Sequence, residues 1–279
     1  MLTMAQSLER ASRLPSISAV LTQALEEMNK PEADISRLAT LLARDQGALA
    51  RLLRVANSAF YGLSGHVSSL SQAVTLIGLP TTRTLVTAAA IIDRFPQRAG
   101  GAFNYQGFWQ HSLGVAAASR YLAPRVGVNP ETAFLGGMLH DIGIAVLGCC
   151  LEEEYRAVLD RVHAEDCATT EAELTVLGFT HDELGAALAE QWKFPLAIQE
   201  AIRSHHALNI QATPLVRVVH VANVLAVTLD IGDIEGSFVP PVDPASWAAF
   251  GFNEPELAGV LEAIDIQAQS ALAVLHEVN

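Results

Sequence analysis

Two stretches decide the fold: FWQHSLGVAAASRYLA at residues 108–123 and FLGGMLHDIG at residues 134–143. Each places a histidine beside small apolar residues, which let neighbouring helices approach closely. A histidine on one helix and a His-Asp pair on another can converge in the core of a helical bundle. The two stretches therefore predict an all-α protein in which His111, His140 and Asp141 lie close together.

The rest of the chain shows apolar residues at helical spacing and no convincing strand alternation. Short amphipathic helices are expected in the first hundred residues, and a Gly- and Pro-containing connector follows at 96–104. Further helices are expected at about 105–122, 130–149, 151–163, 169–177, 181–192, 195–204 and 213–229. A loop at 231–246 and a last helix at about 255–277 complete the chain. We expect two packed helical bundles, at 1–100 and 101–230, and a separate segment at 231–279.

The charge balance limits the choice of partners. The 279 residues carry a formal net charge of -13, which opposes contact with nucleic acid phosphates. Residues 34–57 read as a helix, a break and a helix with Arg44, Arg51 and Arg54, and this pattern resembles a DNA-binding helix-turn-helix. The charge favours an ordinary helical hairpin, so no nucleic acid partner is expected.

The sequence also bears on the compartment. The first fifteen residues lack a continuous apolar run, and the apolar run at 85–92 is well short of the ~20 residues that span a bilayer. The three cysteines form no disulfide framework. We expect a cytoplasmic protein without a membrane partner; the sequence does not fix its oligomeric state.

Further histidines follow the first two stretches. His181 lies in GFTHDELG, His205 and His206 lie in IRSHHA, and His220 and Asn223 share a helical face in VVHVAN. Imidazole and carboxylate groups are the usual ligands of divalent transition metals such as Fe, Mn, Ni or Zn. Asn223 offers only a neutral amide, which binds such ions more weakly than a carboxylate. The alternative is a polar cluster that serves only packing and hydrogen bonding.

Several segments together resemble a known family, the HD-related output domain (HDOD) proteins of bacterial signalling. The resemblance covers roughly residues 13–230 and is most specific in RLLRVANSAFYGLSGHVSSLSQAVTLIG at 51–78. It also includes LPSISAVLTQALEEM, GGMLHDIG, HDELGAALAEQWKFP, IRSHH and VVHVAN.

The resemblance implies a related all-α fold, whose second bundle is like the HD domain of phosphohydrolases, some of which cleave cyclic di-GMP. By position, His111, His140 and Asp141 would hold a first metal together with the residue at Asn223. Asp141, His181, His205 and His206 would hold a second metal.

This chain departs from the active enzymes. Asn223 replaces their final Asp, Ile144 replaces a usual Lys, and no GYP-type motif is present. The resemblance therefore implies a regulatory module with a degenerate metal site that acts on signalling proteins. The alternative is a metal-dependent phosphohydrolase of nucleotides or cyclic dinucleotides.

Overall fold

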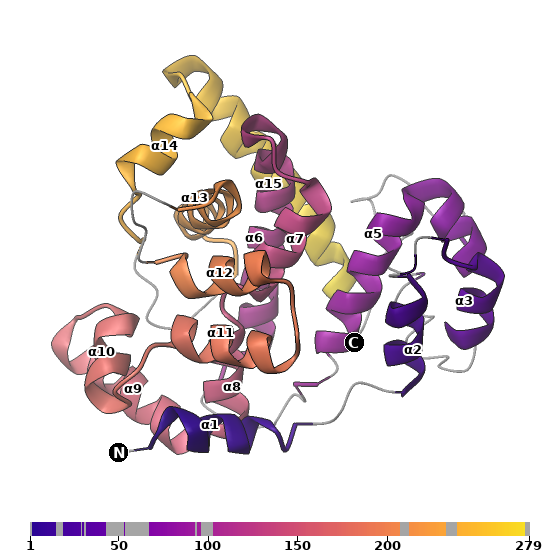
Figure 1. Ribbon diagram of the computed structural model, residues 1–279. Helices are drawn as coiled ribbons and strands as arrows, with labels where there is room; N and C mark the ends of the chain where they lie inside the picture. The colour runs from indigo at the N-terminus through magenta and orange to yellow at the C-terminus, as the bar shows by residue number, and fades with distance from the viewer. Residues whose placement is uncertain are drawn as a thin grey trace. The chain divides into compact units, whose positions relative to one another are not determined.

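The computed structural model describes residues 2–14, 19–28, 30, 32–42, 53, 67–92, 94–95, 103–206, 212–232 and 239–276. Within these ranges all regular elements are helices, so the predicted all-α class is confirmed (Figure 1). Arg44, Arg51 and Arg54, on which the helix-turn-helix alternative depends, lie outside the described residues.

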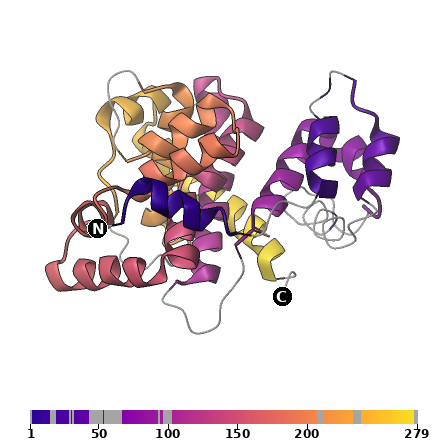
Figure 2. The same ribbon diagram turned by 60° about the horizontal axis from the view of Figure 1, so that its bottom comes forward.

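The chain divides into two compact units. One comprises Met1–Leu14 and Gln97–Ala268, and the other comprises Pro15–Pro96 and Gln269–Asn279. The first helix, α1 (Met4–Ala11), lies against α8 (Ile142–Cys150) and α11 (His181–Gln191), as Figures 1 and 2 both show. The domain boundaries predicted at residues 100 and 230 stay predictions.

The smaller unit contains α2 (Ala19–Met28), α3 (Ile35–Leu42) and α5 (Leu70–Ile92). Apolar side chains from all three helices form its core, including Met28, Leu38 and Leu85. Gly78 interrupts α5 with φ 80°, a left-handed conformation that glycine adopts without steric cost. Pro80 follows inside the same element, so α5 consists of two helical segments that meet at a kink.

The larger unit is a helical bundle that positions the histidines. In it α6 (Tyr105–Leu122) packs against α7 (Pro130–Leu139) and α13 (Pro214–Thr228), while α11 packs against α8 and α12 (Leu196–Ser204). Gly137 allows the close approach of α6 and α7, because a Cβ atom there would lie 2.7 Å from the carbonyl oxygen of Val115. The small residues therefore bring the two helices together as the sequence predicts.

The remaining elements are η2 (Ala123–Val126), α9 (Glu152–Glu165), α10 (Thr169–Val176), α14 (Pro244–Phe250) and α15 (Glu254–His276). Most expected helices of the second bundle agree with the structure to within a residue or two. The loop predicted at 231–246 ends earlier than expected, because α14 begins at Pro244. Asp243 caps this helix by accepting a hydrogen bond from the Ser246 N–H.

The single helix predicted at 130–149 is wrong. The structure has two helices, α7 and α8, separated at His140 and Asp141. Asp141 leaves the helical region with φ -102° and ψ 17°, and its carbonyl oxygen accepts the Ile144 N–H. On a continuous helix, adjacent side chains point about 100° apart. The break instead lets both side chains reach one site.

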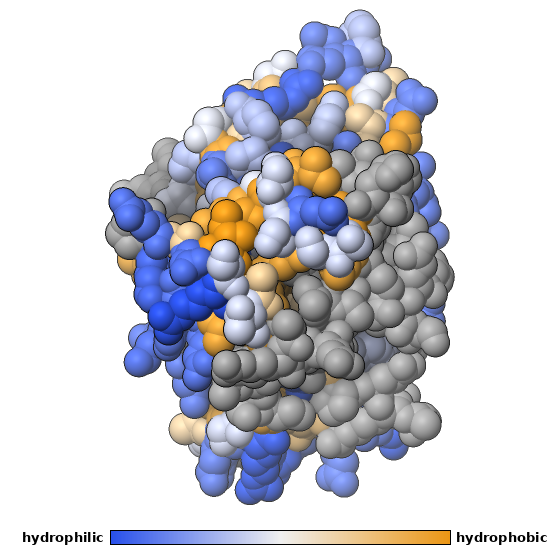
Figure 3. Space-filling model, turned by 90° about the vertical axis from the view of Figure 1, so that its right-hand side faces the viewer, coloured by the Kyte–Doolittle hydropathy of each residue, from blue (hydrophilic) through white to orange (hydrophobic). Residues whose placement is uncertain are grey.

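Two stretches, Leu70–Ile92 and Pro130–Cys150, are long and apolar enough to cross a bilayer by length and composition alone. Of the apolar window in Pro130–Cys150, 89% is buried inside the protein, which is typical of a core helix. Figure 3 shows one face of the molecule, on which hydrophobic residues lie among hydrophilic ones.

Candidate metal centre

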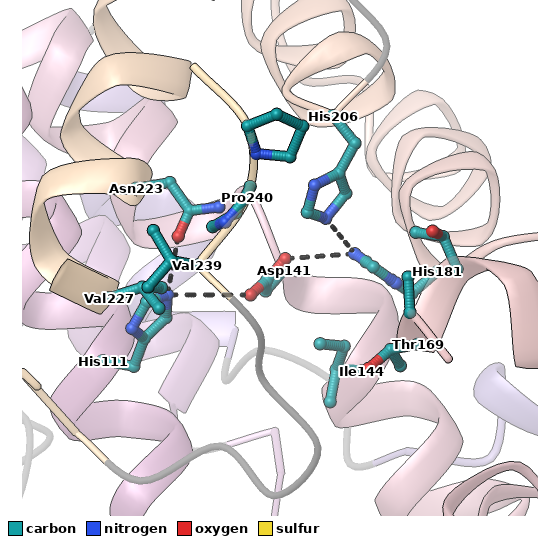
Figure 4. Close-up of a pocket in the computed structure, with 13 residues that line it drawn as sticks. His111, Asp141, Ile144, Thr169, His181, His206, Asn223, Val227, Val239 and Pro240 are labelled. Carbon is teal, nitrogen blue, oxygen red and sulfur yellow. Dashed lines mark hydrogen bonds and ion pairs between the residues drawn. The ribbon is translucent and has the colours of Figure 1, made fainter. Parts of the chain in front are cut away.

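The seven residues predicted from the sequence come together in the larger unit. These side chains form two groups. Within each group, every residue offers one ligand atom, and these ligand atoms all lie within 4.8 Å of one another. The first group, here called subsite A, is His111, His140 and Asp141; the second, subsite B, is Asp141, His181, His205 and His206. Asn223 joins subsite A through His111 (Figure 4).

Asp141 is the residue that the two subsites share. Its Oδ1 lies 3.3 Å from Nε2 of His181 and 3.1 Å from Nε2 of His205. Its Oδ2 lies 3.1 Å from Nε2 of His140 and 3.9 Å from Nε2 of His111. One carboxylate therefore faces four imidazole rings, an arrangement that suits a bridging ligand.

Three of these rings are anchored at Nδ1 by a backbone carbonyl oxygen. The distances are 3.1 Å for His111 and Ile231, 2.8 Å for His140 and Gly137, and 2.7 Å for His205 and Ile202. Since a carbonyl oxygen only accepts, each ring donates from Nδ1, and in its neutral form carries its lone pair on Nε2. Metal-binding histidines are held in this way by their second nitrogen.

Burial sets the charge of the cluster. Burial, assisted by His140, lowers the pKa of His111 to about 4. Burial also lowers the pKa of His205, and lowers that of His206 to well below its usual value. For Asp141, burial alone would raise the pKa, but the neighbouring histidines outweigh it and hold the pKa well below its ordinary value. The ionised carboxylate of Asp141 therefore faces the neutral rings of His111 and His205.

This arrangement leaves buried polar atoms unsatisfied. Nε2 of His140, Nε2 of His205 and Oδ1 of Asp141 have no hydrogen-bond partner among the described residues. Lone pairs of neutral imidazole and carboxylate repel when they face each other, and buried polar groups are normally paired. A divalent cation would satisfy all three atoms at once, and imidazole with carboxylate is a donor set that Fe, Mn, Ni and Zn accept. The residues present therefore fit a metal ion.

Asn223 changes subsite A. Its side-chain amide lies 3.0 Å from Nε2 of His111. The atom at this distance is the amide oxygen Oδ1, which can only accept a hydrogen bond (Figure 4). The amide oxygen thus lies against the ring nitrogen that His111 would offer to a metal.

Glu173 belongs to the site although no sequence motif singles it out. This residue of α10 is fully buried, and its carboxylate accepts the backbone N–H of His181 at 2.8 Å. Both carboxylate oxygens also lie within 3.0 Å of Nδ1 of His181. Burial alone would lower the pKa of His181, but Glu173 and then Asp141 outweigh it and raise the pKa well above its ordinary value.

His220 has a different role from the other histidines. Its Nδ1 donates to the carbonyl oxygen of His205 at 2.8 Å, and its Nε2 accepts the Asp243 N–H at 2.9 Å. His220 lies in neither ligand group. It ties the segment before α14 to the end of α12 and so supports His205 from behind.

A pocket of about 360 Å³ opens onto the cluster. Figure 4 shows Asp141, His181 and His206 on its polar side, with Val227, Val239 and Pro240 nearby. Ile144, at the position where the resemblance implies a Lys, also lines the pocket. Part of the cluster is therefore accessible to a small molecule.

Comparison with known proteins agrees with this fold. The HDOD domain model matches residues 14–208. The chain is 28% identical to an HDOD domain protein of unknown function from Geobacter sulfurreducens, with TM-score 0.74 over 95% of this chain and 97% of that one. It is 27% identical to a candidate phosphohydrolase from Shewanella amazonensis, with TM-score 0.76 over 96% and 97% of the two chains.

A relative of uncharacterized function from Treponema pallidum is 25% identical over 232 residues, which are 80% of this chain and 44% of that protein. The chain thus spans less than half the length of this curated relative. The fold and site define an all-α protein with a buried His/Asp cluster that can hold a metal ion. The chain belongs to the HDOD family.

Proposed function

We propose that this HDOD protein is a regulatory module of bacterial signal transduction that acts through contacts with partner proteins. In this proposal, its buried cluster holds a divalent transition metal without using it for hydrolysis. The observation that carries the proposal is the contact of Asn223 with His111, 3.0 Å from Nε2, at the position where a carboxylate would close subsite A.

Subsite B is the better place for a metal. It offers four donors, from Asp141, His181, His205 and His206, all within 4.8 Å of one another. Subsite A offers three, of which His111 is engaged by Asn223 and lies 3.9 Å from Asp141. A metal in subsite B would supply a fixed positive charge among the ends of α7, α11 and α12. We therefore expect one bound metal per chain.

The described lining of the pocket offers no Lys or Arg that could assist a metal in phosphoryl transfer. Ile144, one of the lining residues, is apolar. Catalysis of phosphoryl transfer depends on positive groups that stabilise the developing charge. The composition of the pocket therefore supports binding over turnover.

One observation favours a second function, that of a metal-dependent phosphohydrolase of nucleotides or cyclic dinucleotides. The pocket of about 360 Å³ reaches Asp141, so a small ligand has access to the candidate metal position. The name of the similar Shewanella amazonensis protein describes that protein as a candidate phosphohydrolase.

An activity screen separates the two functions. The purified chain, loaded in turn with Mn²⁺, Fe²⁺, Ni²⁺ and Zn²⁺, is assayed on a panel of phosphoesters that includes cyclic dinucleotides. The regulatory proposal predicts metal binding with hydrolysis no faster than in the Asp141→Asn variant. Metal-dependent turnover that disappears in this variant would establish the hydrolase instead.

A further inference from the structure

The structure holds a second buried carboxylate beside the cluster, on a helix that contributes no ligand atom. Glu173 lies on α10, a helix of eight residues whose exposed residues include Glu171 and Leu174. Its carboxylate is fully buried, and among the ion pairs of the described residues its partner is His181. A buried carboxylate is costly unless it is hydrogen-bonded, and here the backbone N–H and the ring of His181 supply its hydrogen bonds.

We propose that Glu173 is a positioning residue for subsite B: it fixes the ring of His181 so that Nε2 faces Asp141. This inference rests on the proposed function, because it assigns a role in metal binding. It concerns a residue outside the ligand set.

The contacts of Glu173 fix both the backbone and the ring of His181. One carboxylate oxygen accepts the His181 backbone N–H at 2.8 Å and lies 2.8 Å from Nδ1; the other lies 3.0 Å from Nδ1. Because a carboxylate only accepts, Nδ1 must carry a proton. Nε2, 3.3 Å from Oδ1 of Asp141, is then the nitrogen that serves as the ligand atom.

The place of Glu173 in the fold also explains how its charge is tolerated. His181 is the first residue of α11, so the carboxylate lies at the N-terminus of that helix. A negative group is favoured there by the helix dipole and the free N–H groups. A carboxylate that holds Nδ1–H makes the imidazole a stronger donor, and loss of such a partner typically weakens metal binding roughly 10–100-fold.

The test compares three variants with the wild-type full chain. Glu173→Leu removes the acceptors at similar size, and Glu173→Gln keeps one oxygen but removes the charge. Glu171→Gln, two residues away on the exposed side of the same helix, is the matched control. The affinity for Zn²⁺ is measured by competition with a chelating dye, the absorption spectrum of the Co²⁺ form reports ligand geometry, and circular dichroism verifies folding.

We expect Glu173→Leu to lose roughly 10–100-fold in Zn²⁺ affinity and to shift the Co²⁺ spectrum. Glu173→Gln should lose less, and Glu171→Gln should match the wild type. A folded Glu173→Leu protein with the Zn²⁺ affinity and Co²⁺ spectrum of the wild type overturns the proposal. If Glu173→Leu does not fold, wild-type affinity and spectrum in Glu173→Gln overturn it instead. A wild-type chain that binds neither ion overturns the proposed metal-binding function as well.

Discussion

Nε2 of His205 lies 3.1 Å from Oδ1 of Asp141, and neither atom has a hydrogen-bond partner among the described residues. The carbonyl oxygen of Ile202 holds the proton of His205 on Nδ1. Two lone pairs therefore face each other in a fully buried site, which is unfavourable unless a cation lies between them. This contact is the strongest structural argument that the His/Asp cluster holds a metal.

Asn223→Asp is expected to add a second metal. The substitution would replace the amide beside His111 with a carboxylate and so give subsite A a fourth donor, of negative charge. Elemental analysis should rise from about one to about two metal ions per chain. Asn223→Leu, of similar size but without a donor, is the control and should stay at one. An unchanged metal content in Asn223→Asp would mean that the amide is not what limits subsite A.

Gly143→Ala is expected to disturb the site through packing alone. A Cβ atom at Gly143 would lie 2.0 Å from the carbonyl oxygen of His181, so α8 and α11 would have to move apart. Overpacking of this kind costs about 1–3 kcal/mol. Metal affinity should fall too, because Asp141 and His181 lie at the ends of these helices.

Gly259→Ala is the matched control for this prediction. A Cβ atom at Gly259 would have no neighbouring atom of the described residues within 4 Å, and Ala is the better helix former, by up to about 1 kcal/mol. Denaturant unfolding of both variants measures the difference. Equal stabilities would show that the contact between α8 and α11 is not as tight as the structure indicates.

The stability of the metal-free protein should fall in mild acid, and His111 should account for part of the loss. Its pKa is lowered from 6.5 to about 4, chiefly by burial. Below pH 6.5 the unfolded chain binds a proton at this residue that the folded protein does not bind. The contribution of His111 to the free energy of unfolding is therefore fully present above pH 6.5. It is lost as the pH falls towards 4, and the loss is at most about 3 kcal/mol.

The variant His111→Gln tests this pH dependence. Its free energy of unfolding, measured in the presence of a chelator, should fall less steeply between pH 6.5 and pH 4 than that of the wild type. An identical slope in the two proteins would assign the acid sensitivity to other groups.

His220→Phe is expected to destabilise the larger unit. The change removes the acceptor of the Asp243 N–H and the donor to the carbonyl oxygen of His205, which leaves two backbone groups without these partners. Each such loss costs about 1–3 kcal/mol. Thermal unfolding should show a clearly lower midpoint, whereas His163→Phe, at an exposed position of α9, should change it little. A midpoint equal to the wild type would refute the supporting role of His220.

The sequence predicts which residues cluster, because their residue types are rare in helical cores. His111, His140 and Asp141 stand out beside small residues, and the resemblance to HDOD proteins adds His181, His205 and His206. The structure brings all of them into one cluster.

Two features of the site are not apparent from the sequence. The helix break at His140 carries no proline, and the apolar residues on both sides suit one continuous helix. Glu173 lies in TTEAELTV, an ordinary polar helix sequence, and its role depends on the packing of α10 beside the start of α11. Tertiary contacts rather than local patterns determine both features.

The metal content of the protein purified without chelator tests the central claim most directly. Elemental analysis of the wild type is compared with that of Asp141→Asn, which alters the one residue shared by both subsites. We predict about one transition-metal ion per folded wild-type chain and none in the variant. A wild-type chain that stays free of metal, even after incubation with Mn²⁺, Fe²⁺, Ni²⁺ and Zn²⁺, would contradict the account.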